Sequence, residues 1–214
     1  MPTPIYSPLS QLRSLSAFLI VLVCALLQGC PAIIVGAAGG AAMAAHDRRD
    51  AETMLKDEQI ESNAADKIYS DKALEKKIHA NITSYNQVVL VTGEVLTPEL
   101  RDHAISLIQN ISNIKRIHNE LVVGNLTSFG SRSSDSLITS KIKTKMIGAK
   151  GLDATRVKVV TENGKVFLMG IVTEKEADIA VDIARNVDNV KQVIKIFEII
   201  PEPEKPKTPA PVVN

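Results

Sequence analysis

Aromatic side chains are scarce in this chain: Phe, Tyr and Trp make up 3% of its 214 residues, and Trp is absent. Hydrophobic cores must therefore be built from Ile, Val, Leu and Ala. Such cores suit small layered domains and argue against a platform of stacked aromatics for single-stranded nucleic acid. The formal net charge is only +1. No global field would therefore draw the protein to nucleic acid, and any electrostatic binding must come from a local patch.

Cysteine is almost as scarce, and both copies, Cys24 and Cys30, lie in the apolar N-terminal segment. This placement excludes a disulfide framework and a cysteine metal site in the folded part. Sequence patterns of serine hydrolases, zinc proteases and P-loop proteins are absent. We therefore expect a non-enzymatic protein with no catalytic residue, no metal and no cofactor.

Histidine and glutamate give no support for a metal or acid–base site. The histidines occur on different expected elements, and we interpret them as surface or boundary side chains: His46, His79, His103 and His118. Four glutamates are interpreted as flanking helix starts, where an acid favours the helix dipole: Glu94, Glu99, Glu174 and Glu176.

The N-terminus predicts the location of the protein. Arg13 precedes an apolar run over residues 14–27, which is the pattern of a secretory signal peptide. The following Leu27-Gln28-Gly29-Cys30 resembles a bacterial lipobox, which implies that residues 1–29 are removed and that Cys30 carries fatty acids such as palmitate. Pro at the next position, instead of Asp, implies the inner leaflet of the outer membrane, facing the periplasm.

A membrane-spanning anchor is the alternative reading of this segment. No charged residue occurs between Arg13 and Asp47, and 18 or more apolar residues can cross a bilayer. Pro31 and the glycines that follow it argue against a continuous spanning helix.

Composition divides the rest of the chain. Residues 30–65 are expected to hold the lipidated cysteine and a Gly/Ala-rich tether, residues 125–135 read as a linker, and residues 201–214 read as a Pro-rich disordered tail.

An internal repeat predicts two domains, at residues 66–124 and 136–200. The run 88–93 aligns with 165–170, and each is an expected strand that ends in Gly. A helix and a further strand follow each run, and a helix and a short strand precede it. The expected ranges are 66–80, 81–85, 97–109 and 114–123 in the first unit, and 136–148, 157–162, 174–186 and 190–199 in the second. The predicted class is α+β, with two tandem αββαβ units, each a three-stranded mixed sheet with two helices on one face.

This order, together with the run TENGKVFLMGIVTEKEA at 161–177, resembles the BON domain family, and the whole plan resembles its dual-domain outer-membrane lipoproteins. Gly93 and Gly170 match the family glycine, where a side chain would hinder a backbone bend. The resemblance implies binding of anionic phospholipid, phosphatidylglycerol in particular, by the first helix of the second domain. It also implies support of outer-membrane integrity, proximity to the β-barrel assembly machinery and a link to the division site.

The local charge of that helix agrees with a surface that binds an anionic membrane. Residues 131–150 carry five cations against one anion, whereas the rest of the chain is nearly balanced. We predict that an apolar and basic group forms the lipid-facing surface: Leu137, Ile138, Lys141, Ile142 and Lys145. At about 100° per residue, Ile138 and Ile142 also belong to the stripe that faces the sheet, so we expect them to be partly core. The alternative is an ordinary solvated lysine-rich face.

Two further functions stay open. One is a protein-interaction adaptor for envelope assembly that uses the free face of a sheet or the Pro-rich tail. The other is an osmotic-stress protectant, a second role linked to periplasmic members of the family.

Overall fold

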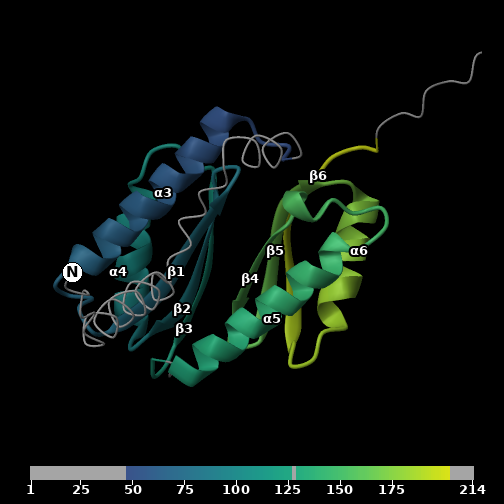
Figure 1. Cartoon of the computed structure of the whole chain (residues 1–214). Helices are drawn as coiled ribbons and strands as arrows, with labels where there is room; N and C mark the ends of the chain where they lie inside the picture. The colour runs from purple at the N-terminus through teal and green to yellow at the C-terminus, as the bar shows by residue number, and fades with distance from the viewer. Residues whose placement is uncertain (1–46, 127–128, 203–214) are drawn as a thin grey trace, which may run out of the picture. The chain divides into compact units, whose positions relative to one another are not determined.

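The computed structural model describes residues 47–126 and 129–202, which lie within one compact unit, residues 43–214. Two domains with the same element order follow each other (Figure 1). The first domain contains α3 (Ala51–Ser70), β1 (Ile78–Tyr85), β2 (Val88–Val95), α4 (Pro98–Gln109) and β3 (Arg116–Val123). The second contains α5 (Phe129–Ile147), the 3-10 helix η1 (Ala154–Arg156), β4 (Lys158–Glu162), β5 (Lys165–Val172), α6 (Glu174–Arg185) and β6 (Gln192–Ile199). The predicted α+β class and αββαβ order are confirmed.

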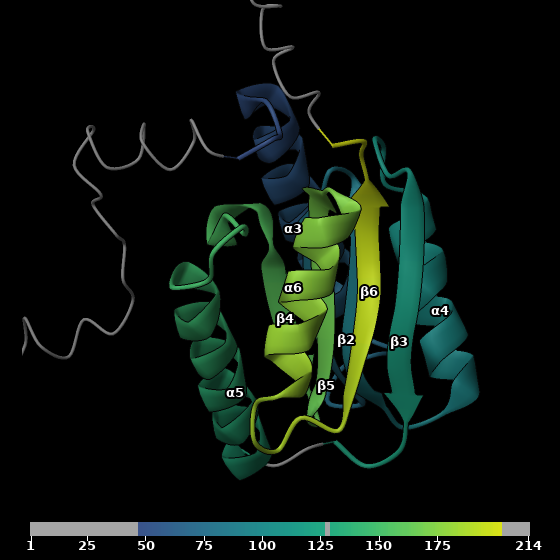
Figure 2. The ribbon, with the colours of Figure 1, turned by 90° about the vertical axis from the view of Figure 1, so that its right-hand side faces the viewer.

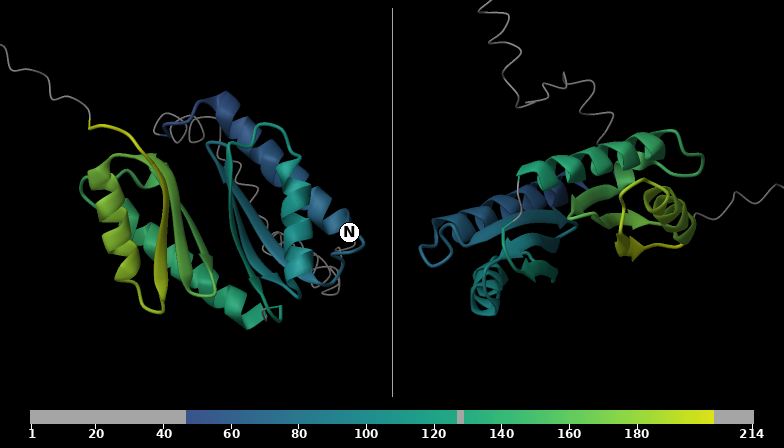
Figure 3. Two further views of the ribbon diagram at one scale, coloured as in Figure 1. Left: turned by 180° about the vertical axis from the view of Figure 1, so that it is seen from behind. Right: turned by 90° about the horizontal axis from the view of Figure 1, so that it is seen from below.

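Each domain has one three-stranded mixed sheet. The hairpin strands pair antiparallel, β1 with β2 and β4 with β5, and the third strand pairs parallel to the middle one. The middle strand and the third strand are joined by a crossover helix, as parallel neighbours require. Figure 2 shows α5 and α6 together over one face of their sheet, and Figure 3 shows α3 and α4 with theirs.

The crossover helices begin where the sequence provides caps. Thr97 accepts a hydrogen bond from the N–H of Leu100 before α4, and Pro98 occupies the first helical position. Thr173 and Glu176 form a reciprocal capping box before α6. These caps explain why the expected starts of both helices agree closely with the structure.

The first helix of the first domain was wrongly placed at 66–80. The helix is α3, Ala51–Ser70, which begins after the cap Asp50 and ends at Asp71. Fifteen of its residues lie in the range assigned to the tether. Lys76 has a positive φ of 58°, and Ile78 already belongs to β1. The buried apolar residues Ile68, Leu74 and Ile78 therefore lie on a helix, a turn and a strand, and do not share one helical stripe.

The linker between the two domains is also shorter than predicted. Helix α5 begins at Phe129, within the expected linker 125–135. Residues 127 and 128, most of the Pro-rich tail and the Gly/Ala-rich segment lie outside the described residues.

Strand alternation gives each sheet two buried faces. Toward the helices, Val89, Val91 and Val95 of β2 join the first core, and Val166, Leu168 and Val172 of β5 join the second. The opposite faces meet in a third cluster that draws on both domains: Tyr85, Leu90, Val160, Phe167 and Met169. The sheet face that the adaptor hypothesis required to be free is therefore covered in this region by the other domain.

Residues 48 and 49 connect to both domains just before α3. Arg48 Nη1 donates to the carbonyl oxygen of Ile171 at 2.9 Å and to Glu176 Oε2 at 2.6 Å. Arg49 Nη1 donates to Asp57 Oδ2 at 2.8 Å, and its guanidinium lies 3.8 Å from the centroid of the Tyr85 ring. The segment before α3, which lies within the predicted tether, is thus bonded to the second domain by Arg48 and to the first by Arg49.

Candidate functional site

Helix α5 separates its apolar residues into a core stripe and an exposed set. Ile138, Ile142 and Met146 recur every four residues and are at most 4% exposed in the core of the second domain. Ile138 and Ile142 were predicted to face lipid, and this part of the prediction is wrong. Their spacing directs both side chains toward the sheet, where they are buried in the core of the second domain.

Leu137 is one residue out of the core stripe and points to solvent, with 64% of its surface exposed. Ile147, which the sequence reasoning missed, is 77% exposed near the end of the same helix. It follows Met146 as Leu137 precedes Ile138, so the same off-stripe reasoning could have found it. Among the described residues these are the two most exposed large hydrophobic side chains, ahead of Leu55 and Tyr69 of α3, which are each 55% exposed.

Between Leu137 and Ile147 run hydroxyl side chains that are already hydrogen-bonded. Ser140 donates to the carbonyl oxygen of Ser136 at 2.9 Å, and Thr144 donates to that of Ser140 at 2.9 Å. Such bonds to the preceding turn satisfy a hydroxyl without water. This strip of α5 can therefore lose water at a smaller cost than its composition suggests.

Lysines flank the strip, and Lys141, Lys143 and Lys145 are all exposed. Within residues 47–126 and 129–202, these three ammonium groups take part in no ion pair. Lys145 Nζ donates to the carbonyl oxygen of Asn186, at the end of α6, at 3.3 Å. Partial burial and the nearby Lys158 lower the pKa of Lys143. The helix thus presents positive charge that the described acids leave uncompensated.

The two glycines of the repeat lie inside β2 and β5, not at the strand ends where we had expected a backbone bend, and each allows a close approach of backbones. A Cβ at Gly93 would overlap the carbonyl oxygen of His79 on the neighbouring strand, and Gly93 also has a φ of +119°. A Cβ at Gly170 would overlap the carbonyl oxygen of Arg156. Both positions therefore exclude any side chain, although only Gly93 needs the left-handed conformation.

The lipidation residue Cys30 lies outside the described residues. Among the helices of the described part, none combines the length and hydropathy needed to cross a bilayer.

Three titratable side chains that the sequence reasoning set aside come together. His79 on β1, Glu94 on β2 and Glu162 on β4 place one ligand atom each within 4.8 Å of one another. We had expected Glu94 to flank a helix start, but it lies within β2, which continues to Val95. Its alternation with Leu90 and Thr92 aims it at the second domain instead. His103 lies elsewhere and contacts Asp71 at 3.0 Å.

Comparisons with known proteins agree with the internal repeat. The BON domain family matches twice, at residues 56–125 and 134–201. The chain is 37% identical over 174 residues to the outer membrane lipoprotein DolP of Haemophilus influenzae, covering 81% of this chain and 90% of that protein. It is 36% identical over 154 residues to a 21 kDa hemolysin of Actinobacillus pleuropneumoniae, covering 72% and 79%. Osmotically-inducible protein Y of Escherichia coli is 27% identical over 121 residues, covering 55% and 60%.

Proposed function

Because the chain belongs to the family of BON-domain proteins, we propose that it is a non-enzymatic outer-membrane lipoprotein that holds α5 against anionic phospholipid. In this proposal acylated Cys30 anchors the protein to the inner leaflet of the outer membrane, facing the periplasm. The anchor keeps the second domain near the bilayer, so α5 needs only modest affinity of its own. Phosphatidylglycerol is the lipid proposed, and support of outer-membrane integrity is the resulting role.

The exposure of Leu137 and Ile147 among lysines on α5 is the observation that carries the proposal. Aliphatic side chains of this size gain free energy by leaving water at the level of the headgroups. A lysine near an anionic membrane contributes about 1 kcal/mol, and long lysine side chains can keep their charge at the headgroups while their stems lie along apolar surface. The satisfied hydroxyls of Ser140 and Thr144 lower the cost of the approach.

The name of one relative supports the location. This relative is called an outer membrane lipoprotein, and the chain spans 90% of it. The lipobox-like run before Cys30 agrees with that name. Recruitment to the division site and contact with the β-barrel assembly machinery are proposed only as consequences of belonging to the same family.

A fluorophore on α5 tests membrane contact directly. After cleavage before Cys30, the acylated cysteine is the sole one in the mature chain, so a label on a new cysteine is unique. We suggest Leu137→Cys and Ile147→Cys, with Ser106→Cys on the exposed side of α4 as the control. Each acylated protein is placed in vesicles of phosphatidylcholine, with and without phosphatidylglycerol.

The proposal predicts a blue shift at positions 137 and 147, increased by phosphatidylglycerol and reduced by salt, with position 106 unchanged. Replacing Lys141 and Lys145 by Gln should remove the effect of phosphatidylglycerol. Replacing Lys67 and Lys72 by Gln removes the same charge from the first domain and should leave the effect intact. Labels at 137 and 147 that stay solvent-like in both vesicles would overturn the assignment of α5.

A further inference from the structure

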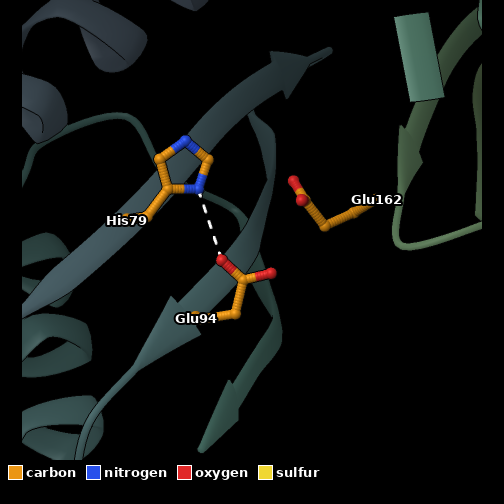
Figure 4. A group of neighbouring side chains, drawn as sticks. All are labelled: His79, Glu94 and Glu162. Carbon is orange, nitrogen blue, oxygen red and sulfur yellow. Dashed lines mark ion pairs between the residues drawn. The ribbon is translucent and has the colours of Figure 1, made fainter. Parts of the chain in front are cut away.

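A histidine and two glutamates from both domains converge at the polar end of the junction between the sheets. Figure 4 shows the carboxylates of Glu94 and Glu162 and the imidazole of His79 turned toward one another. His79 and Glu94 are cross-strand partners on β1 and β2, and His79 Nδ1 lies 3.5 Å from Glu94 Oε2. Glu162 reaches the pair from β4 of the second domain.

Two carboxylates of the cluster are buried close together, and Arg132 of α5 is a nearby cation. Glu94 is 3% exposed and Glu162 is 8% exposed. Within residues 47–126 and 129–202, Glu162 takes part in no ion pair, and the one hydrogen bond recorded for it is a long one from Thr92, at 3.4 Å. A buried pair of carboxylates this close calls for a counter-charge.

The histidine supplies a second, independent observation. The Nδ1 atom of His79 is buried and has no hydrogen-bond partner within the described part of the chain. A buried ring nitrogen without a hydrogen bond is costly. This nitrogen faces the two carboxylates, at ion-pair distance from Glu94, although the His79 side chain as a whole is 26% exposed. A nitrogen lone pair and carboxylate oxygens in one place form a ligand set, because neutral imidazole and carboxylate both bind transition metals.

We propose that His79 Nδ1 and the carboxylates of Glu94 and Glu162 bind one divalent transition-metal cation of the Zn²⁺ type. Imidazole favours Zn²⁺ over Ca²⁺ and Mg²⁺, which prefer oxygen ligands throughout. Zn²⁺ holds such ligands at about 2.0–2.2 Å, so the three atoms, now within 4.8 Å of one another, need only a small convergence.

The surroundings allow a cation to enter and be held. His79 and Glu162 line an open cleft of about 650 Å³ whose wall carries charges of both signs: Glu61, Asp135, Arg132 and Lys158. Water from the cleft can fill the remaining coordination positions. On the other side, Asn163 Nδ2 donates to Glu94 Oε1 at 2.5 Å and fixes that carboxylate. A ligand that is itself hydrogen-bonded is oriented in advance.

A cation here would bond β1 and β2 of the first domain to β4 of the second. The bound ion would therefore stabilise the junction of the two domains, a role separate from lipid contact by α5. Failure of the lipid experiment would leave this site unaffected, and failure of this experiment would leave α5 unaffected.

The test uses the full acylated chain in detergent, treated with a chelator and titrated with ZnCl₂. We expect a rise in Tm that saturates at one ion per chain, with no such rise for MgCl₂ or CaCl₂. Glu162→Gln keeps the shape of the side chain and should weaken Zn²⁺ binding at least about tenfold. His103→Gln is the matched control, because it removes another histidine that lies beside a carboxylate.

Absorption of Co²⁺ in place of Zn²⁺ gives a readout that does not depend on stability. Visible bands of a protein-bound ion should form in the parent and in His103→Gln, and should be lost in Glu162→Gln and in His79→Gln. Binding that survives both His79→Gln and Glu162→Gln, or is lost in His103→Gln, would overturn the site. So would the absence of any saturable effect of Zn²⁺ on the parent.

Discussion

Asp57 of α3 and Asp135 of α5 do the same work in the two domains: each aspartate holds the turn of its own hairpin. Asp57 accepts hydrogen bonds from the backbone N–H groups of Asn86 and Gln87, at 2.8 and 2.7 Å. Asp135 accepts them from Asn163 and Gly164, at 2.8 and 2.9 Å. All four of these turn residues have left-handed backbones that leave their N–H groups pointing toward the helix: Asn86, Gln87, Asn163 and Gly164. The first helix of each unit is thus bonded to its sheet at an equivalent point.

Replacing Asp57 by Ala should lower the free energy of unfolding strongly. Besides the turn, Asp57 accepts from Ser84 Oγ at 2.6 Å and from Arg49, and hydrogen bonds to a charged group contribute about 1.5–3 kcal/mol each. We expect a loss of at least about 3 kcal/mol in urea unfolding. Asp66→Ala, on the exposed side of the same helix, is the control and should change little. Equal stability of the two variants would contradict the role of Asp57.

Alanine at Gly93 or Gly170 should be poorly tolerated, because the new Cβ would overlap a carbonyl oxygen of the adjacent strand or turn. We expect each substitution to cost about 3 kcal/mol or more, measured by urea unfolding. Gly124→Ala is the matched control, since no heavy atom lies within 4 Å of its Cβ position. Gly93 should be the more sensitive of the two, as it also has a positive φ.

Acid should weaken the bond between the second domain and the segment before α3. Burial alone would raise the pKa of Glu176, but hydrogen bonds from Arg48, Thr173 and Arg156 outweigh it and hold the pKa below its ordinary value of 4.5. Because the folded pKa is the lower one, this contribution is fully present above pH 4.5 and is lost as the pH falls through the folded pKa.

Urea unfolding across this acid range checks the sign. Glu176→Gln should lose stability at neutral pH and show a shallower decline in acid than the parent. Glu174→Gln, at an exposed position in the first turn of α6, should retain the parent's decline. An unchanged acid profile in Glu176→Gln would count against the paired state of this carboxylate.

Phe167→Ala tests the junction between the sheets. Phe167 is 1% exposed and belongs to the cluster that both domains share. Truncation of a buried Phe costs about 3–5 kcal/mol. We expect this loss in urea, together with faster proteolysis at residues near the linker, since the two domains would separate more easily. A small loss with unchanged proteolysis would show that the junction contributes little.

The sequence predicted the crossover helices best, because Thr97 and Thr173 cap them and Pro98 starts the first. It failed at α3, whose buried stripe is one residue per turn: Ile60, Ala64 and Ile68. A stripe this narrow in a charged segment resembles a solvated tether until the sheet beneath it is known. Leu137 is exposed, as its position beside the core stripe predicted. Ile138 and Ile142 were predicted to be both partly core and lipid-facing, and the structure shows only their core role.

The polar cluster could not be predicted from local patterns. Glu94 and Glu162 are 68 residues apart in sequence, and each lies on a strand face that looks exposed within its own domain. Only the packing of one domain against the other buries them together. Alternation of Leu90, Thr92 and Glu94 does indicate their common face, which is the single clue that the sequence offers.

The shared cluster of Tyr85, Leu90, Val160, Phe167 and Met169 has a consequence for how the protein behaves when dilute. A single domain of this kind would need a second molecule to cover the apolar face of its sheet. That association would become weaker as the protein is diluted. Here both domains belong to one polypeptide, so each meets the other at an effective concentration that does not depend on the concentration of the protein. The chain therefore holds two similar but non-identical domains together in a pairing that dilution does not weaken.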